Sequence, residues 1–215
     1  FGTACQVWRY DGSSWRQANR NSFGDDDNRA IRCMAVFGGY LYAGTYAASG
    51  CQVWRTDGTG GPPCHWTKVS SPADVGGAMN YSATAMAATP TRLYVGTATA
   101  GGLGCEVWRY DGAAWAISVG PGSPRPRGFG NNKNSEVSAM AVSPTGEVYT
   151  GTHKQESEGC DVWRGSGTTW TRANTNGFGD ADNLEVSSLC FNGATAIAGT
   201  YNDKTGAAVF QYTGP

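Results

Sequence analysis

The sequence predicts an all-β fold, a four-bladed β-propeller, and three observations lead to this prediction. Glycine and aromatic residues are frequent, with 32 glycines and 8 tryptophans in a chain of 215 residues. One short motif recurs along nearly the whole chain at intervals of 46 to 55 residues. The segments between its copies divide into short apolar runs bounded by turn residues, as β-strands do. A four-stranded unit that repeats at this interval is typical of a propeller blade.

The recurring motif reads Cys-x-Val-Trp-Arg. Its four complete copies begin at Cys5, Cys51, Cys105 and Cys160, and a degenerate fifth copy covers 207–212. Each copy follows a Gly-Thr pair, and each complete copy is followed by a turn and a second tryptophan. Later in each repeat an asparagine stands six residues before a methionine or leucine. These fixed offsets indicate one structural unit used repeatedly.

Each unit is expected to supply four short strands, named here A to D in chain order. In the first complete unit strand A covers 33–36, strand B covers 40–45, strand C is the motif, and strand D follows the second tryptophan. We interpret residues 1–215 as one propeller domain. Its approximate repeats are 1–30 (partial), 31–82, 83–136, 137–185 and 186–215 (partial).

Four A strands predict four blades. The fourth blade takes strands A and B from 186–200 and is expected to close the ring with strand D from the N-terminus, near Trp15. One C strand is then surplus, because 5–10 and 207–212 compete for one position. An unpaired strand favours association. A five-bladed ring is the alternative, although the chain has no fifth strand A.

The composition argues against several classes of protein. A net charge of −1 with 15% charged residues disfavours nucleic-acid binding. The apolar runs are too short for a membrane-spanning helix. The chain has no Cys-x-x-Cys pair and only two histidines, so a zinc site of the usual spacing is absent. Few lysines and the glycosylation triplet at Asn80 favour an extracellular or cell-surface protein.

Two sequence patterns resemble a known class. The strings Gly-Cys-Glu-Val-Trp-Arg-Tyr-Asp-Gly at 104–112 and Gly-Phe-Gly-Asp at 177–180 resemble bacterial-type propeller proteins built from such units. The Asp-Gly-x-x-Trp hairpins at 11–15 and 111–115 resemble a shortened Asp-box of BNR-repeat propellers such as sialidases. The resemblance implies the propeller fold and no particular activity, because propellers include enzymes, lectins and scaffolds.

Variable loops are expected on one face of the ring, where binding usually resides. The B–C loops are 46–50, 98–104, 153–159 and 201–206, and the D–A loops are 20–29, 71–80, 120–135 and 174–184. The predicted ligand-binding residues lie in or beside these loops: Asn28, Asn80, Asn134, Asn183, Tyr46, Tyr201, His153 and Arg125. For the asparagines the favoured alternative is structural, because asparagine satisfies backbone groups at loop ends.

No catalytic residue and no cofactor are predicted. Asp25, Asp27, Asp180 and Asp182 are weak calcium candidates, since carboxylates bind this ion. The third copy places Lys133 among the corresponding residues, so a solvated turn is the preferred interpretation. The strand C cysteines are expected too far apart to pair with one another, whereas a bridge between Cys33 and Cys190 stays open.

The leading hypothesis for function is an extracellular, non-enzymatic binding module that recognises carbohydrate or a cell-surface polymer. The alternative is a structural subunit of an extracellular filament or assembly, linked by exchange of the surplus strand. The third hypothesis is an Asp-box-type glycoside hydrolase, which the scarcity of converging carboxylates disfavours.

Overall fold

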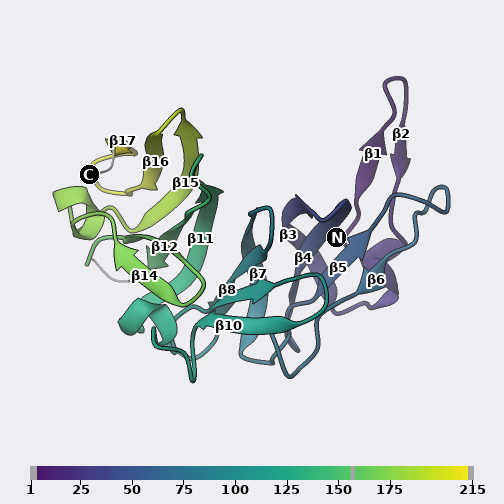
Figure 1. The fold of residues 1–215 in the computed structure, drawn as a ribbon, viewed down its shortest axis with the longest axis horizontal. Helices are drawn as coiled ribbons and strands as arrows, with labels where there is room; N and C mark the ends of the chain where they lie inside the picture. The colour runs from purple at the N-terminus through teal and green to yellow at the C-terminus, as the bar shows by residue number, and fades with distance from the viewer. Residues whose placement is uncertain (1–3, 156–157, 213–215) are drawn as a thin grey trace.

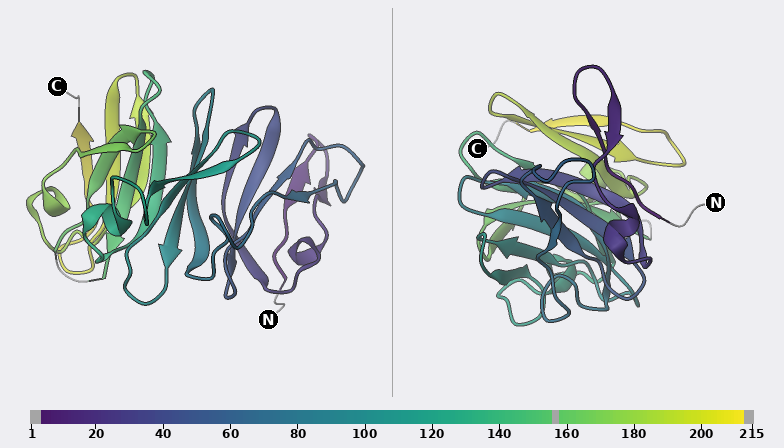
Figure 2. Two further views of the ribbon diagram at one scale, coloured as in Figure 1. Left: turned by 60° about the horizontal axis from the view of Figure 1, so that its bottom comes forward. Right: turned by 90° about the vertical axis from the view of Figure 1, so that its right-hand side faces the viewer.

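The computed structural model describes residues 4–155 and 158–212 and shows an all-β, antiparallel architecture. Three four-stranded blades follow one another along an arc (Figure 1). A separate two-stranded hairpin lies at the N-terminal end of the arc, and a three-stranded unit lies at the other end (Figures 1 and 2). No helix in the described part of the chain has the length and apolar character that a membrane crossing requires.

The strands map onto the repeats in order. The N-terminal hairpin is β1 (Trp8–Tyr10) and β2 (Trp15–Gln17). The first blade is β3 (Asn28–Phe37), β4 (Tyr40–Ala47), β5 (Val53–Thr56) and β6 (Thr67–Lys68). The second is β7 (Asn80–Ala88), β8 (Leu93–Thr99), β9 (Val107–Tyr110) and β10 (Trp115–Val119). The third is β11 (Asn134–Val142), β12 (Val148–Lys154), β13 (Val162–Ser166) and β14 (Thr169–Arg172). The C-terminal blade is β15 (Glu185–Asn192), β16 (Thr195–Tyr201) and β17 (Val209–Tyr212).

The A strands are longer than the sequence predicts. In the first three blades they begin at the repeated asparagine, at Asn28, Asn80 and Asn134. Each of these strands contains β-bulge register shifts near its start. These shifts allow the polar residues before the apolar part of the strand to pair with strand B as well. The A strands of successive blades pack against one another, so they form the inner layer of the arc.

A buried polar node fixes each blade. In the second blade Thr97 donates a hydrogen bond to Asn80 Oδ1 (2.9 Å), and Asn80 Nδ2 donates to Glu106 Oε2 (2.8 Å). The backbone amide of Glu106 in turn donates to Thr97 Oγ1 (3.1 Å). The same node is built by Asn28, Thr45 and Gln52 in the first blade and by Asn134, Thr152 and Asp161 in the third.

The node also links neighbouring blades through the backbone. The amides of Cys51, Cys105 and Cys160 donate to the carbonyls of Asn80, Asn134 and Asn183 in the next blade, at 2.6 to 2.7 Å. Asn80 and Asn134 therefore each join strands A, B and C of their own blade to strand C of the blade before it. Because buried polar groups must be paired, this position accepts few other residues.

The Gly-Thr glycines let blades approach closely. A Cβ on Gly44 would lie 2.8 Å from the side chains of Ala83 and Met86 in the next blade. The corresponding atom on Gly96 would lie 2.5 Å from Val137. No side chain fits there, which explains why strand B carries a glycine at this point.

Short 3-10 turns precede three of the blades: η1 (Asn21–Gly24), η2 (Arg127–Gly130) and η3 (Asn176–Gly179). In each turn a phenylalanine adopts the left-handed conformation, with φ of 57° at Phe23 and 59° at Phe129. This costs about 1 kcal/mol in an L-residue. The Phe23 ring stacks on Trp54 at 5.0 Å and the Phe129 ring on Trp163 at 5.0 Å, which offsets that cost.

Trp54 and Trp163 of the motif thus pack on the phenylalanine of the turn that precedes their blade, and the second tryptophans connect neighbouring blades. The indole N–H of Trp66 donates to the Ala18 carbonyl (3.0 Å), and that of Trp115 donates to the Val69 carbonyl (2.7 Å). All seven cysteines are free thiols. The expectation that strand C cysteines do not pair is therefore confirmed, and the bridge between Cys33 and Cys190 is not formed.

The predicted ring closure is not made among the described residues. The strand near Trp15 was expected to complete the fourth blade, but β2 pairs only with β1. The edge of β16 is instead occupied by β17, the degenerate copy of the motif. One physical reason is that a strand edge accepts a single partner, so β17 excludes β1 from that position.

We predict that Asn134→Ala lowers the free energy of unfolding by about 3 kcal/mol, because Thr152 and the buried Asp161 lose their shared partner. Asn132→Ala, an exposed residue of the same loop, is the control and should change stability by less than about 0.5 kcal/mol. Urea unfolding followed by tryptophan fluorescence measures both. Equal losses for the two variants would contradict the role of the node.

Candidate functional site

One band of residues runs across all four blades, on the face of the arc where strands A begin and strands B end. The residue after each Gly-Thr pair is backbone-paired with the second residue after each repeated asparagine. The pairs are Tyr46 with Ala30, Ala98 with Ser82, His153 with Glu136, and Tyr201 with Glu185. Between blades the same residues pair again, Tyr46 with Ser82, Ala98 with Glu136, and His153 with Glu185. The band belongs to the face that carries the B–C and D–A loops.

Side chains from different blades meet along this band. Arg32 of β3 forms an ion pair with Glu136 of β11 at 3.9 Å. These strands belong to the first and third blades, so the contact spans the concave side of the arc past the second blade. Arg32 is half exposed, whereas the Glu136 side chain is 23% exposed. The pair therefore lies at the rim of the inner layer with its arginine open to solvent.

Two tyrosines lie beside this ion pair. The rings of Tyr46 and Tyr81 meet edge to face with centroids 5.8 Å apart. Burial raises the pKa of the Tyr81 phenol, and the charge of Glu136 raises it further, while Arg32 lowers it. Tyr81 therefore lies within electrostatic reach of both members of the ion pair.

The pKa of the Glu136 carboxyl is raised. Burial raises the pKa of Glu136 first, and the neighbouring charge of Glu185 adds to the rise. Arg32 and His153 lower the pKa of Glu136. The charges of a carboxylate, a guanidinium and an imidazole thus all act on the Glu136 carboxyl.

We refer to this group of residues as the axial cluster: Arg32, Tyr46, Tyr81, Glu136, His153 and Glu185. It combines aromatic rings with hydrogen-bond donors and acceptors on the variable face. Sites of this composition fix a small polar ligand by a few placed polar groups against ring surfaces. Among the described residues, no group of three or more histidine, cysteine, aspartate or glutamate side chains is arranged to hold a metal ion.

The sequence-predicted ligand residues separate into two groups. Tyr46, His153 and Tyr201 occupy one repeat position and are brought into the same band, and Tyr201 is 49% exposed. The four asparagines are buried, and their side chains are engaged within the polar nodes. They act as structural residues here, which is the alternative that the sequence favoured. The glycosylation triplet falls on one of these nodes, so its Asn80 side chain is inaccessible in the folded chain.

The Arg125 side chain makes structural contacts with the third blade. Its guanidinium donates to the Trp170 carbonyl at 2.8 Å and lies 5.0 Å from the centre of the Trp163 ring. The acidic loops are tied internally in a similar way. Asp25 accepts from Gln52 and Asp27 from Ser49, while Asp180 accepts from Asn202 and Asp182 from Lys204. These hydrogen bonds fit the solvated-turn interpretation of the acidic strings.

Sequence reasoning missed Arg32, Tyr81, Glu136 and Glu185. A signal was available, because the second residue after the repeated asparagine is Ala30, Ser82, Glu136 or Glu185. Positions that hold the fold together, such as the repeated asparagine, keep their residue type across the repeats. The second residue after that asparagine varies instead between small and charged side chains. Only the strand pairing shows that it faces the position of Tyr46 and His153.

Comparison with known proteins supports the fold and leaves the activity open. No family model and no curated protein matches the sequence. Among solved structures, a luciferin-regenerating enzyme matches with a TM-score of 0.59 at 12% identity, over 99% of this chain and 72% of its own. An α-L-arabinofuranosidase from Clostridium thermocellum matches with a TM-score of 0.52 at 13% identity, over 86% and 68% of the two chains. A Hadza microbial sialidase matches with a TM-score of 0.52 at 13% identity, over 92% and 46%.

These matches show a propeller fold. The chain spans less than half the length of the sialidase. At 12 to 13% identity the likeness extends to the fold alone, so the number of blades in a closed ring and the specific function are not established by it.

We predict opposite pH dependences for two glutamate variants. The pKa of Glu136 is raised in the folded protein, so the folded state favours the protonated carboxyl. The contribution of Glu136 to the free energy of unfolding is therefore present at low pH and is lost as the pH rises and the carboxyl ionises. Glu136→Gln removes that loss, and its stability relative to wild type should increase between about pH 3.5 and pH 7.

Glu158→Gln is the control. Hydrogen bonds from Lys133 and Asn131 lower the pKa of Glu158, so its contribution is present above the ordinary carboxyl range and lost at low pH. The stability of this variant relative to wild type should therefore decrease over the same interval. Unfolding free energies across the pH series measure both, and the same sign for the two variants would contradict the assignment.

Proposed function

We propose that the protein is an extracellular, non-enzymatic module that binds carbohydrate at the axial cluster. The observation that carries the proposal is the aromatic pair of Tyr46 and Tyr81 beside the Arg32–Glu136 ion pair, on the face with the variable loops. An extracellular location stays a prediction from composition.

The chemistry of a sugar ring suits this arrangement. Its C–H faces pack on aromatic rings, and its hydroxyls need both donors and acceptors. Tyrosine supplies an apolar ring with a polar tip. Arg32 donates, and the Glu136 carboxylate, held by Arg32, accepts. An acidic sugar gains a further contact because a guanidinium binds carboxylates in a bidentate way.

The cluster is a single site rather than one site in each blade. The residues that converge differ between repeats, with a tyrosine in the first blade, alanine in the second and histidine in the third at one position. We therefore expect one ligand for each arc.

A second candidate function is glycoside hydrolysis, and a specific observation favours it. Glu136 has a raised pKa and lies within electrostatic reach of Glu185, and such pairs divide the roles of acid and nucleophile or base. Glu136 is, however, paired with Arg32, which favours its charged form. We therefore prefer binding without turnover.

We predict that Tyr46→Ala weakens carbohydrate binding at least about tenfold, because the ligand loses one aromatic face. A glycan array identifies a ligand for the wild type, and calorimetry with that ligand measures the affinity of each variant. Arg92→Ala is the matched control, because Arg92 lies at the A–B hairpin of the second blade, on the opposite face. It should bind as the wild type does.

A reducing-sugar assay on a polysaccharide panel separates the two candidate functions. No turnover together with binding supports the module. Turnover that Glu136→Gln abolishes would establish the hydrolase instead. Absence of any carbohydrate binding, with the wild type folded, contradicts both.

A further inference from the structure

The two ends of the arc each lack groups that every internal blade interface supplies. We propose that the N-terminal hairpin, β1–β2, completes the C-terminal blade of a second copy of this chain and displaces β17 from its edge. This exchange does not depend on carbohydrate binding.

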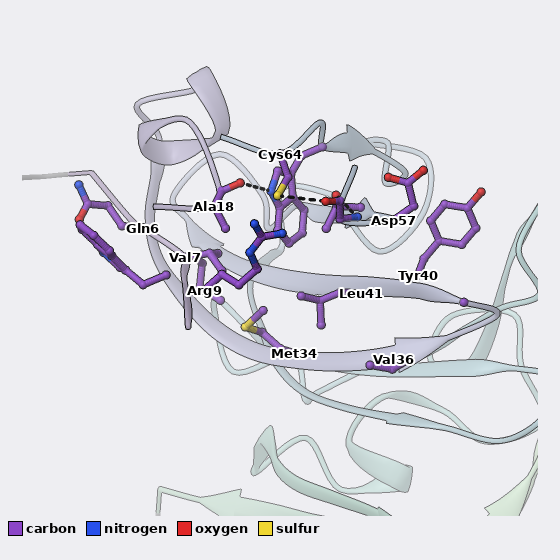
Figure 3. Close-up of a pocket in the computed structure, with 16 residues that line it drawn as sticks. Gln6, Val7, Arg9, Ala18, Met34, Val36, Tyr40, Leu41, Asp57 and Cys64 are labelled. Atoms are coloured by element: carbon purple, nitrogen blue, oxygen red, sulfur yellow. Dashed lines mark hydrogen bonds between the residues drawn. The ribbon is translucent and has the colours of Figure 1, made fainter. Parts of the chain in front are cut away.

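A groove of about 620 Å³ lies at the N-terminal end (Figure 3). One side of it is formed by the free edge of β1 and the other by β3 and β4 of the first blade. Met34 and Val36 of β3 face it with 41% and 68% of their surface exposed. The residue equivalent to Met34 in the second blade, Met86, is only 9% exposed because strand B of the preceding blade covers it.

The covering group at internal interfaces is the Gly-Thr glycine. Gly44 packs against Ala83 and Met86, and Gly151 packs against Val186. In the C-terminal blade, Gly199 is the corresponding glycine, and the atoms nearest to a Cβ built on it belong to Ser187 and Ser188 of its own blade. The exposed surface of β3 and the surface of β16 around Gly199 are therefore the two surfaces that meet at an internal blade interface.

The C-terminal blade also lacks a polar partner that the N-terminal copy of the motif carries. In the second and third blades, Asn Nδ2 donates to a side-chain oxygen at the second position of the motif, Glu106 or Asp161. The C-terminal blade has Ala208 there, and Asn183 Nδ2 donates only to the Gly177 carbonyl in the described structure. In the N-terminal copy of the motif the equivalent residue is Gln6, just before β1, whose side-chain oxygen accepts from Trp8.

The aromatic contacts show the same complementarity. Phe23 stacks on Trp54 and meets the edge of Trp66, and Phe129 does the same with Trp163 and Trp170. Phe178 stacks only on Phe210 of β17, at 4.2 Å. Its missing edge partner is the second tryptophan of a D strand, which the described residues of the C-terminal blade do not include.

The N-terminal hairpin holds both tryptophans with large parts of their surfaces exposed. Trp8 is 51% exposed and Trp15 is 64% exposed. Placed on the edge of β16, β1 would bring Trp8 over Phe178 and β2 would bring Trp15 to the edge of the same ring. One hairpin thus supplies the oxygen, the two indoles and the fourth strand that the C-terminal blade lacks.

β17 is the weaker occupant of that position. It is the degenerate copy of the motif, and Val209 is 75% exposed in it. The hairpin and the C-terminal blade lie at opposite ends of the arc (Figure 1), so the geometry favours exchange between two copies. Because the contact is head-to-tail, further copies can add at the free ends.

Sedimentation velocity over a range of protein concentrations tests the proposal. Wild type should show reversible association. Removal of residues 207–215, which takes away β17, should strengthen association at least about tenfold, since the competing strand is gone.

Val36→Lys should weaken association at least about tenfold, because it places a charge in the proposed interface, while leaving the monomer folded since Val36 is exposed there. Leu103→Lys is the matched control, an apolar residue with 37% exposure in a B–C loop, and should associate as wild type does. Comparison of these two full-length variants does not depend on whether the truncated chain folds.

Three results would overturn the proposal. The first is a wild type that sediments as a monomer at every concentration. The second is equal association of Val36→Lys and Leu103→Lys. The third is a truncated chain that stays monomeric while hydrogen exchange in β1 slows, because that result shows closure within one chain.

Discussion

The buried node of asparagine, threonine and the second residue of the motif is the interaction on which the architecture depends. It joins the start of strand A to strands B and C, and the asparagine carbonyl receives the amide of the preceding blade. A short four-stranded sheet cannot bury both of its faces alone, so blades are stable only when stacked. The node fixes the register of that stacking, and the Gly-Thr glycine beside it allows the close approach.

This constraint explains why so much of the fold could be predicted from the sequence. Asn80, Thr97 and Glu106 have equivalents at similar places in the other complete blades because three side chains must meet in one buried place. Repetition reveals such positions in a single sequence. It could not reveal the ring closure, because the choice between β1 and β17 for the edge of β16 depends on the relative strength of two strands that carry copies of the same motif.

The candidate site was predictable only in part, for the opposite physical reason. Binding residues are those that repetition does not constrain, so Glu136 and Glu185 stand at a position that is alanine or serine in other blades. Tyr46 and His153 were found because the sequence analysis assigned them to variable loops, although they lie near the ends of strands β4 and β12. That they lie together with Arg32 follows from strand pairing across blades and from the curvature of the arc, which no single repeat encodes.

The most direct test of the account is hydrogen exchange of individual backbone amides in the native state. The inter-blade hydrogen bonds join the amides of Cys51, Cys105 and Cys160 to the carbonyl of the repeated asparagine in the next blade. These three amides should exchange only through global unfolding and should be the slowest in the chain. Exchange of all three at rates typical of local opening, while amides in mid-strand positions stay protected, would contradict the node as the constraint that holds the blades together.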